Sequence, residues 1–193
     1  MFARTPRLLL RPGWKEDANA LAQAIDDTAI LRNLTRVPSP YRPQDAEAFL
    51  SMPQDSLQPR LLIFARTQGA PRLVGGCGIE RCADGTPELG YWIARPYWGL
   101  GFATEATRAL LGMSRASGVR GVRAAHFADN PASGHVLRKM GFRFTGRVEK
   151  RRSPGRESAA DCLIFEEGCV LFLDLGQFEK RLYAMLGRVA DDR

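Results

Sequence analysis

The chain has 193 residues, and at about 100 to 200 residues per domain this length predicts a single globular domain over residues 1–193. Hydrophobic residues make up 45% and charged residues 25%, which excludes a disordered chain or a small disulfide scaffold. Lys and Arg number 28 against 21 Asp and Glu, so the net charge of +7 favours anionic partners. The charge alone does not choose among nucleic acid, a phosphorylated cofactor and an acidic peptide.

The cysteines and the first residues indicate a reducing compartment. All four cysteines lie within apolar stretches, and residues 1–15 lack the longer apolar run that a signal peptide needs. No run approaches the roughly 20 apolar residues of a membrane span. The spacings of the cysteines and of His126 and His135 do not match a zinc site. We therefore expect a cytoplasmic protein with no metal and no membrane contact.

Apolar periodicity predicts the elements of the first half in chain order. A first strand covers Leu8–Leu10, helical spacing follows over Lys15–Leu34, and a second helix starts near Pro43. Three apolar runs divided by turn residues then predict consecutive antiparallel strands, at Arg60–Ala65, Leu73–Ile79 and Leu89–Ala94.

The second half alternates helices and strands. Helical spacing covers Phe102–Ala116, a strand is expected at Val119–Phe127, and Asn130 with Pro131 begins a helix that Gly141 ends. The expected closing elements are strands Phe142–Val148 and Cys162–Leu173, the basic segment Glu149–Asp161 between them, and a short helix Gln177–Leu186. This order predicts an α/β fold, with a mixed, mostly antiparallel sheet of about seven strands flanked by helices on both faces.

The segment Glu88–Ala106 carries the densest chemical signal, since a strand runs through a glycine turn into a helix. Gly99 and Gly101 let backbone N–H groups approach a ligand, and the helix N-terminus behind them attracts negative charge. A dinucleotide fingerprint would need a glycine where Thr104 stands, and a Walker loop would need a lysine. A phosphate cradle and a plain tight turn both remain open on this segment alone.

A second cluster, Asp129–Phe142, follows one strand later. Together the two segments resemble the GNAT superfamily of acetyl-CoA-dependent N-acetyltransferases, and most closely its branch that acetylates N-terminal amines of ribosomal proteins. In element order the resemblance covers roughly Leu8–Leu173. Trp98 stands where the family has Gln or Arg. The matching positions of the second motif are Asn130, Ser133, Val136, Leu137, Lys139, Gly141 and Phe142.

The resemblance implies acetyl-CoA as cosubstrate and places its binding residues in three groups. Backbone N–H groups near Trp92 and Ile93 would face the thioester oxygen, where the family's strand bulges and splays from the next. Asn130 and Ser133 would touch the cofactor arm, although Asn130 also suits a helix cap. Lys139, with Arg138, would reach the 3′-phosphate unless both are solvated charges. The pyrophosphate turn would consist of Trp98, Gly99, Leu100, Gly101, Phe102, Ala103 and Thr104.

The resemblance also implies the proton-transfer groups. Leu137 stands where many members have the tyrosine that protonates the thiolate, so Ser133 is the expected acid. The base is Glu88 or His126; the alternatives are an exposed charge at a strand end and a core histidine. Deprotonating an α-amine of pKa about 8 at pH 7 costs roughly 1.4 kcal/mol, against roughly 4.6 kcal/mol for lysine. A site with a doubtful base therefore favours an α-amine.

The sequence thus predicts an N-acetyltransferase in which a primary amine, a peptide N-terminus or a small amine, attacks the thioester directly in a ternary complex. The basic segment Arg147–Arg156 is either a solvated loop or a site that selects an acidic acceptor or contacts ribosomal RNA. The alternatives are a non-catalytic nucleic-acid or ribosome-binding module and a CoA-binding sensor. Both a monomer and a homodimer fit the apolar last strand and helix.

Overall fold

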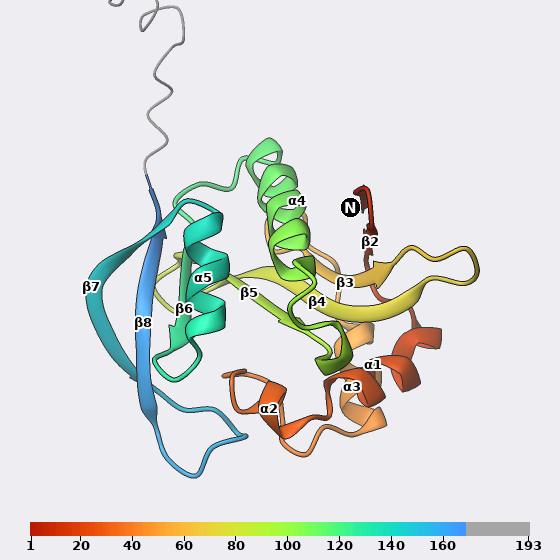
Figure 1. The fold of residues 1–193 in the computed structure, drawn as a ribbon, viewed down its shortest axis with the longest axis horizontal. Coiled ribbons are helices and arrows are strands. Elements are labelled where there is room, and N and C mark those ends of the chain that lie inside the picture. Colours follow the sequence, from red (N-terminus) through yellow and green to blue (C-terminus); the bar gives the residue numbers. More distant parts are fainter. Residues whose placement is uncertain (169–193) are drawn as a thin grey trace, which may run out of the picture.

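The computed structural model describes residues 1–168, which form one twisted sheet with helices on both faces (Figure 1). The strand order is β1-β2-β3-β4-β5-β6-β8-β7, and β5–β6 is its parallel pair while the other neighbours are antiparallel. This confirms the predicted α/β class, with a two-residue β1 in addition to the expected strands. The strands are β1 (Ala3–Arg4), β2 (Leu8–Arg11), β3 (Arg60–Ala65), β4 (Arg72–Arg81), β5 (Pro87–Ile93), β6 (Arg123–Phe127), β7 (Phe142–Arg151) and β8 (Ala160–Glu167).

The helices cover the two faces of the sheet separately (Figure 1). On one face, α4 (Phe102–Ala116) and α5 (Pro131–Lys139) pack on a core that includes Leu110, Leu137 and Phe165. On the other, α1 (Ala18–Ile25), α2 (Thr28–Leu31) and α3 (Pro43–Ser51) enclose a smaller core. Within residues 1–168 no helix is long and apolar enough to cross a membrane.

The single helix predicted over Lys15–Leu34 is wrong, because the chain forms a 3₁₀ turn (Lys15–Asp17), α1 and α2 there. The break lies at Asp26 and Asp27. The Asp27 carboxylate accepts a hydrogen bond from the N–H of Ala29 at 2.8 Å and caps α2. Aspartate competes with helical backbone bonds in this way, and a periodic apolar pattern does not register it.

The limits of β2, β4 and β5 shift by one or two residues from those predicted, and three limits in the second half also change. The strand expected from Val119 starts at Arg123, because Gly121 turns the chain at a φ of 65°. The strand expected to end at Val148 continues to Arg151 past an irregularity in its pairing with β8. The final strand starts at Ala160. Its expected end at Leu173 and the predicted helix Gln177–Leu186 lie outside the described residues.

The strands β5 and β6 separate after a short contact, and this separation positions the site. They pair only at Glu88 with Arg123 and at Leu89 with Ala124. Beyond that point β6 continues against β8, while β5 keeps a uniform register with β4 as far as Ile93. The sheet therefore opens between β5 and β6. The expected splay is present, whereas the pairing of β5 with β4 shows no bulge.

Candidate functional site

The turn from Trp98 into α4 presents backbone N–H groups to the opening of the sheet. Gly99 and Gly101 have φ values of 77° and 78°, which side chains other than glycine rarely adopt. Nothing lies within 4 Å of where a Cβ on Gly99 would stand, so the turn leaves open space. The first N–H groups of α4 have no partner within the helix. The Trp98 indole donates to the Ile93 carbonyl at 2.6 Å and ties the turn to β5.

Arg7, in the turn between β1 and β2, fixes the turn before α4, a contact that the sequence did not reveal. Its guanidinium donates to the Leu100 carbonyl at 2.8 Å and to the Glu105 carboxylate at 2.7 Å. Glu105 is in the first turn of α4, where an uncompensated carboxylate would repel a bound anion. Burial would raise the pKa of Glu105, but hydrogen bonds from Thr5 and Arg7 outweigh it and lower the pKa. Arg7 therefore preserves the positive character of the helix N-terminus.

Strand alternation separates the two amides expected at the thioester. The N–H of Ala94 donates to Val74 of β4, and alternate residues of an antiparallel pair share this orientation. The N–H of Trp92 therefore also points to β4, while those of Tyr91 and Ile93 point to the opening beside β6. The structure thus brings Ile93 to the opening and turns the Trp92 amide away.

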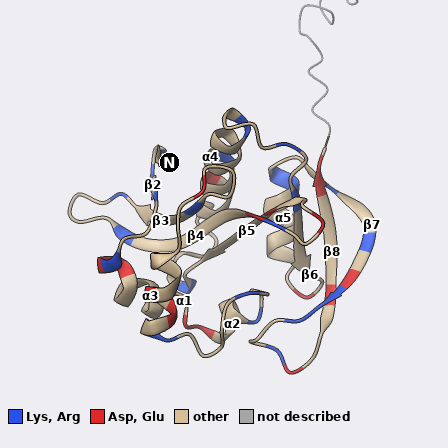
Figure 2. Ribbon diagram, turned by 180° about the vertical axis from the view of Figure 1, so that it is seen from behind, with Lys and Arg blue, Asp and Glu red and all other residues tan. Residues whose placement is uncertain are grey.

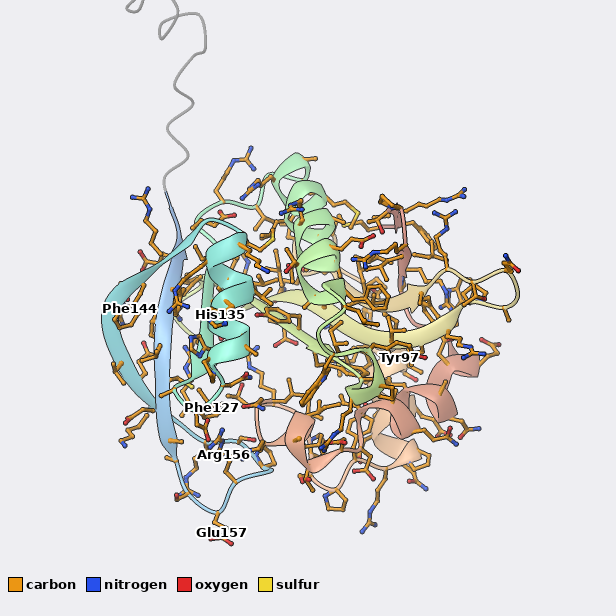
Figure 3. All side chains as sticks on the ribbon, in the orientation of Figure 1. Tyr97, Phe127, His135, Phe144, Arg156 and Glu157 are labelled. Atoms are coloured by element: carbon orange, nitrogen blue, oxygen red, sulfur yellow. The ribbon has the colours of Figure 1, made fainter. Side chains whose placement is uncertain are left out.

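The opening is the centre of a cavity of about 450 Å³ that runs from α5 to α2. Figure 3 labels a lining residue from each side, His135 on α5 and Tyr97 in the 3₁₀ turn (Arg95–Tyr97) before α4. Leu100 and Arg138 do not line it; Arg138 lies 5.7 Å from the Phe165 ring. The expected site residues that line it are Glu88, Trp92, Ile93, Trp98, Gly99, Gly101, Phe102, Ala103, Thr104, His126, Asn130, Ser133 and Lys139.

Ser133 lies at the start of α5, where Asn130 caps the helix by accepting from the Ser133 N–H at 3.4 Å. The Ser133 hydroxyl shares a hydrogen bond of 2.7 Å with the phenol of Tyr91. Burial raises the pKa of Tyr91 to about 12, so the phenol stays protonated at neutral pH. The phenol also lies 3.1 Å from the Ser133 carbonyl, so its single proton has two acceptors. When the phenol donates to the Ser133 Oγ, the serine proton is free to donate into the cavity. Tyr91 was not among the site residues expected from the sequence.

His126 is 6% exposed, and only one of its ring nitrogens has a partner. Nδ1 lies 2.8 Å from the Phe127 carbonyl, while Nε2 has no hydrogen bond. Nε2 faces α5 so closely that a Cβ on Gly134 would stand 2.6 Å away, which explains a glycine inside this helix. Burial lowers the pKa of His126, and the charge of Arg138 adds to this effect. The imidazole is therefore neutral at pH 7.

Glu88 is held by two arginines rather than exposed at a strand end. Both oxygens accept from Arg151, at 2.7 and 2.9 Å, and the Arg123 Nε lies 3.4 Å away. Burial would raise the pKa of Glu88, but the hydrogen bonds and charge of Arg151 outweigh it, and the net pKa is lowered. The carboxylate is therefore ionised and is a weak base.

Glu88 lies on one face of the sheet, and Ser133 and His126 lie on the other. Along β5, Leu89, Tyr91 and Ile93 pack on the core below α4 and α5, whereas Trp92 packs on the α1–α3 side. By alternation Glu88 shares the face of Trp92. Ser133 and His126 belong to the α5 face. The opening between β5 and β6 joins the two faces.

The basic segment is largely neutralised within the protein. Arg147, Lys150 and Arg151 pair with Glu149, Asp161 and Glu88 respectively. Figure 2 shows the two signs of charge interleaved along β7 and β8. Arg156 pairs with Asp129 and lies 4.1 Å from the Phe127 ring (Figure 3). Arg147 and Lys150 remain 60% and 69% exposed within their ion pairs, and Arg152 is exposed, so the segment is paired within the protein and also solvated.

The donors at the opening fit a phosphorylated ligand with a long arm. The N-terminus of α4 offers backbone N–H groups for a pyrophosphate, and the unpaired edge of β5 offers N–H and C=O groups for the arm. Lys139 adds a positive charge on the α5 side. Residues 1–168 contain no cluster of three or more His, Cys, Asp or Glu that could hold a metal ion.

Comparisons with known proteins agree with this geometry. A family described as "Acetyltransferase (GNAT) domain" matches residues 7–143. A protein of Bacillus licheniformis named "Uncharacterized N-acetyltransferase p20" is 27% identical over 157 residues, which cover 79% of this chain and 88% of that protein.

Solved structures share the fold at low sequence identity. A GNAT acetyltransferase from Bacillus anthracis has a TM-score of 0.72 at 21% identity, covering 86% of this chain and 97% of the other. RimL, described as a ribosomal L7/L12 α-N-protein acetyltransferase in complex with CoA, has a TM-score of 0.70 at 18% identity and the same coverage. The microcin C7 self-immunity acetyltransferase MccE, solved with acetyl-CoA and AMP, has a TM-score of 0.67 at 19% identity, covering 84% and 92%.

Proposed function

Since this chain belongs to the GNAT family and is an acetyl-CoA-dependent N-acetyltransferase, we propose that its acceptor is the α-amine of a peptide or protein N-terminus. Family membership makes the chain an enzyme rather than the binding module or CoA sensor that the sequence left open. The observation that carries the proposal is the ion-paired Glu88. A carboxylate with a lowered pKa is a poor match for lysine, whose deprotonation at pH 7 costs roughly 4.6 kcal/mol, and suffices for an α-amine at roughly 1.4 kcal/mol.

Acetyl-CoA supplies the acetyl group as a thioester. The residues proposed to hold it are Asn130, Ser133 and Lys139, the amide of Ile93, Trp92 at the wall of the opening, and the turn Trp98–Thr104. Trp98 and Leu100 act in this turn by fixing its shape, through the indole bond to β5 and the carbonyl bond to Arg7. The thioester carbonyl would lie beside the N–H of Ile93, which stabilises developing negative charge on its oxygen.

Glu88 is the base we favour over His126. The carboxylate lies on the face where α1–α3 leave room for an acceptor, and its Oε1 accepts only from Arg151, which leaves a lone pair for an ammonium or a bridging water. The amine nitrogen loses a proton towards Glu88 as the bond from nitrogen to carbon forms. His126 lies on the cofactor side, with Nε2 against α5, and its proposed role is limited to a proton path there.

Ser133 completes the reaction on the opposite face. As the bond between carbon and sulfur breaks, the Ser133 Oγ donates a proton to the sulfur, and the Tyr91 phenol replaces it through their 2.7 Å hydrogen bond. Tyr91 recovers its own proton from solvent. The amine thus approaches from one face and the thiol leaves on the other.

The test uses two matched peptides of one sequence that contains an internal lysine, one with a free N-terminus and one with a blocked N-terminus. We expect thiol release from acetyl-CoA with the free peptide only, and mass spectrometry should place the acetyl group on the α-nitrogen. Acetylation of the lysine in the blocked peptide at a comparable rate would refute the proposed acceptor. Glu88→Gln should lower kcat with the free peptide more than His126→Gln does; the reverse order would transfer the role of base to His126.

A further inference from the structure

A second cavity, of about 380 Å³, lies on the α1–α3 face of β4 and β5. Its walls are mostly apolar and come from the helical segment 21–52 and from strands β3, β4 and β5. Met52, 43% exposed, lines the cavity where it opens to solvent. The apolar wall residues on the helix side are Leu21, Ile25, Val37, Tyr41, Phe49 and Met52.

Glycines keep the floor of this cavity low. Gly78 of β4 is paired with Gly90 of β5, and the floor bears no side chain at this point. Packing explains the glycine at position 78, since a Cβ there would stand 2.9 Å from the Pro59 carbonyl. Neither packing nor backbone conformation explains the glycine at position 90, because the φ of Gly90 is not positive and nothing lies within 4 Å of where its Cβ would stand. A glycine without a backbone requirement, at the floor of a cavity, leaves space for a ligand.

The second cavity is continuous with the cofactor cavity. Leu34, Thr35 and the β5 segment 88–92 line both. An amine that reaches the thioester from this face therefore carries its neighbouring side chain into the apolar cavity. Glu88 lies where the two cavities meet, so the second cavity can receive the side chain on the α-carbon of the reacting amine.

Each charged group at this cavity already has a partner within the protein. Glu80 forms an ion pair with Arg36, and Glu88 is held by Arg151. Asp45 accepts a hydrogen bond from the Arg42 N–H, and Arg60 donates to the Pro53 carbonyl. A charged acceptor side chain would have to break such a pair or lose its hydration without compensation. An apolar side chain has neither cost and gains from leaving water.

We infer that this cavity binds the apolar side chain of the acceptor's first residue, so that the enzyme prefers peptides starting with Leu, Met or Phe over those starting with Ser or Asp. The inference rests on the proposed function, because it assigns the side chain of an α-amine acceptor. Full burial of such a side chain should raise kcat/KM by about tenfold to a hundredfold over serine.

The experiment compares peptides that differ only in the first residue, with thiol release from acetyl-CoA as the readout. We expect kcat/KM to fall from Leu, Met and Phe to Ser and then Asp. If all the peptides are acetylated and kcat/KM for the Ser or Asp peptide equals that for the Leu peptide, the inference about the cavity is overturned and the proposed function stands. If no peptide reacts, the proposed function fails, and the cavity is then tested with 2-phenylethylamine and ethanolamine; equal rates with these two amines, or none, would overturn the inference as well.

Two variants that fill the cavity sharpen the test. Gly90→Val puts a branched side chain on the floor, and Ala48→Phe, on α3, narrows the wall of this cavity without lining the other one. Each should lower kcat/KM for the Leu peptide by about tenfold or more. Ala48→Phe should lower that for a Gly peptide much less, and Gly90→Val, which also faces the cofactor cavity, should lower it to an intermediate extent. The matched control is Ala116→Phe at the exposed end of α4, outside both cavities. Equal losses for the Leu and Gly peptides would contradict a side-chain pocket.

The thermal shift that acetyl-CoA produces in each variant separates a filled pocket from a damaged fold. We expect Ala48→Phe to keep this shift within about 1 °C of that of Ala116→Phe, because Ala48 does not line the cofactor cavity. If Ala48→Phe loses both the thermal shift with acetyl-CoA and the preference for the Leu peptide, the substitution disturbs the whole fold, and the assignment of this cavity to the acceptor side chain is overturned.

Discussion

The two cavities that meet along β5 are built in opposite ways. The cofactor side draws its phosphate cradle from one continuous segment, Trp98–Thr104, whose glycines are visible in the sequence. The acceptor side is assembled from α1, α3 and the two glycines of β4 and β5, which lie far apart in the chain. All members of the family bind the same cosubstrate, so its turn needs one backbone conformation. Acceptors differ between members, and an apolar acceptor pocket can be formed by many different apolar residues. The following predictions separate the two sides, from the largest expected effect to the smallest.

Gly101→Val should abolish cofactor binding. A β-branched residue is strained at a φ of 78°, and Gly101 is the residue before the first turn of α4. We expect the KM for acetyl-CoA to rise at least about a hundredfold and the thermal shift with acetyl-CoA to disappear. Gly112→Ala, at an exposed position inside the same helix, is the control and should bind normally and gain stability. Normal binding of acetyl-CoA by Gly101→Val would contradict the proposal that this turn binds the pyrophosphate.

Ser133→Ala should lower kcat about tenfold to a hundredfold, because a general acid is lost while the CoA thiol remains a fair leaving group. Tyr91→Phe should have a smaller effect of the same kind, and the double variant should be no worse than Ser133→Ala alone. Steady-state kinetics at saturating acetyl-CoA checks this. The control is Ser114→Ala, which removes a buried hydroxyl that has no partner. Additive losses in the double variant would show that Tyr91 and Ser133 do not act together.

Glu88→Gln should destabilise the fold by about 1–3 kcal/mol at pH 7, since it removes the charge that both Glu88 oxygens offer to the partly buried Arg151 and leaves that arginine with Glu149 alone. The pKa of Glu88 is lower in the folded protein than in the unfolded chain, so its stabilisation is present above the unfolded pKa and is lost as the pH falls through the folded pKa.

Urea unfolding at several pH values measures this contribution. The difference in unfolding free energy between the wild type and Glu88→Gln should be constant above about pH 5.5 and shrink as the pH falls below about 4.5. Glu80→Gln removes an exposed ion pair and should cost less than about 1 kcal/mol. A difference for Glu88→Gln that does not change with pH would contradict the ion pair.

Arg7→Ala should raise the KM for acetyl-CoA several-fold and leave kcat within about twofold, because Glu105 then puts an uncompensated negative charge at the start of α4. The matched control is the double variant Arg7→Ala with Glu105→Gln, which should recover most of the lost affinity. If the second substitution recovers nothing, Arg7 acts through the shape of the turn and not through its charge.

Local chemistry explains which features the sequence predicted. The glycine turn, the Asn130 cap and the sheet class follow from short segments, and the structure contains them. Three features depend on residues that meet only in the fold: Glu88 with Arg151, Tyr91 with Ser133, and Arg7 with Glu105, at separations of 63, 42 and 98 residues. The sequence did not predict the helix break at Asp26 and Asp27, because the apolar periodicity continues through these residues while the Asp27 side chain caps a new helix.

The most direct test of adjoining cofactor and acceptor cavities is the affinity of a bisubstrate compound, in which CoA is linked through an acetyl bridge to the α-nitrogen of a Leu peptide. The account predicts binding at least about a hundredfold tighter than CoA alone, and loss of most of that gain in Ala48→Phe but not in Ala116→Phe. Binding no tighter than CoA, or a gain that Ala48→Phe leaves intact, would contradict it.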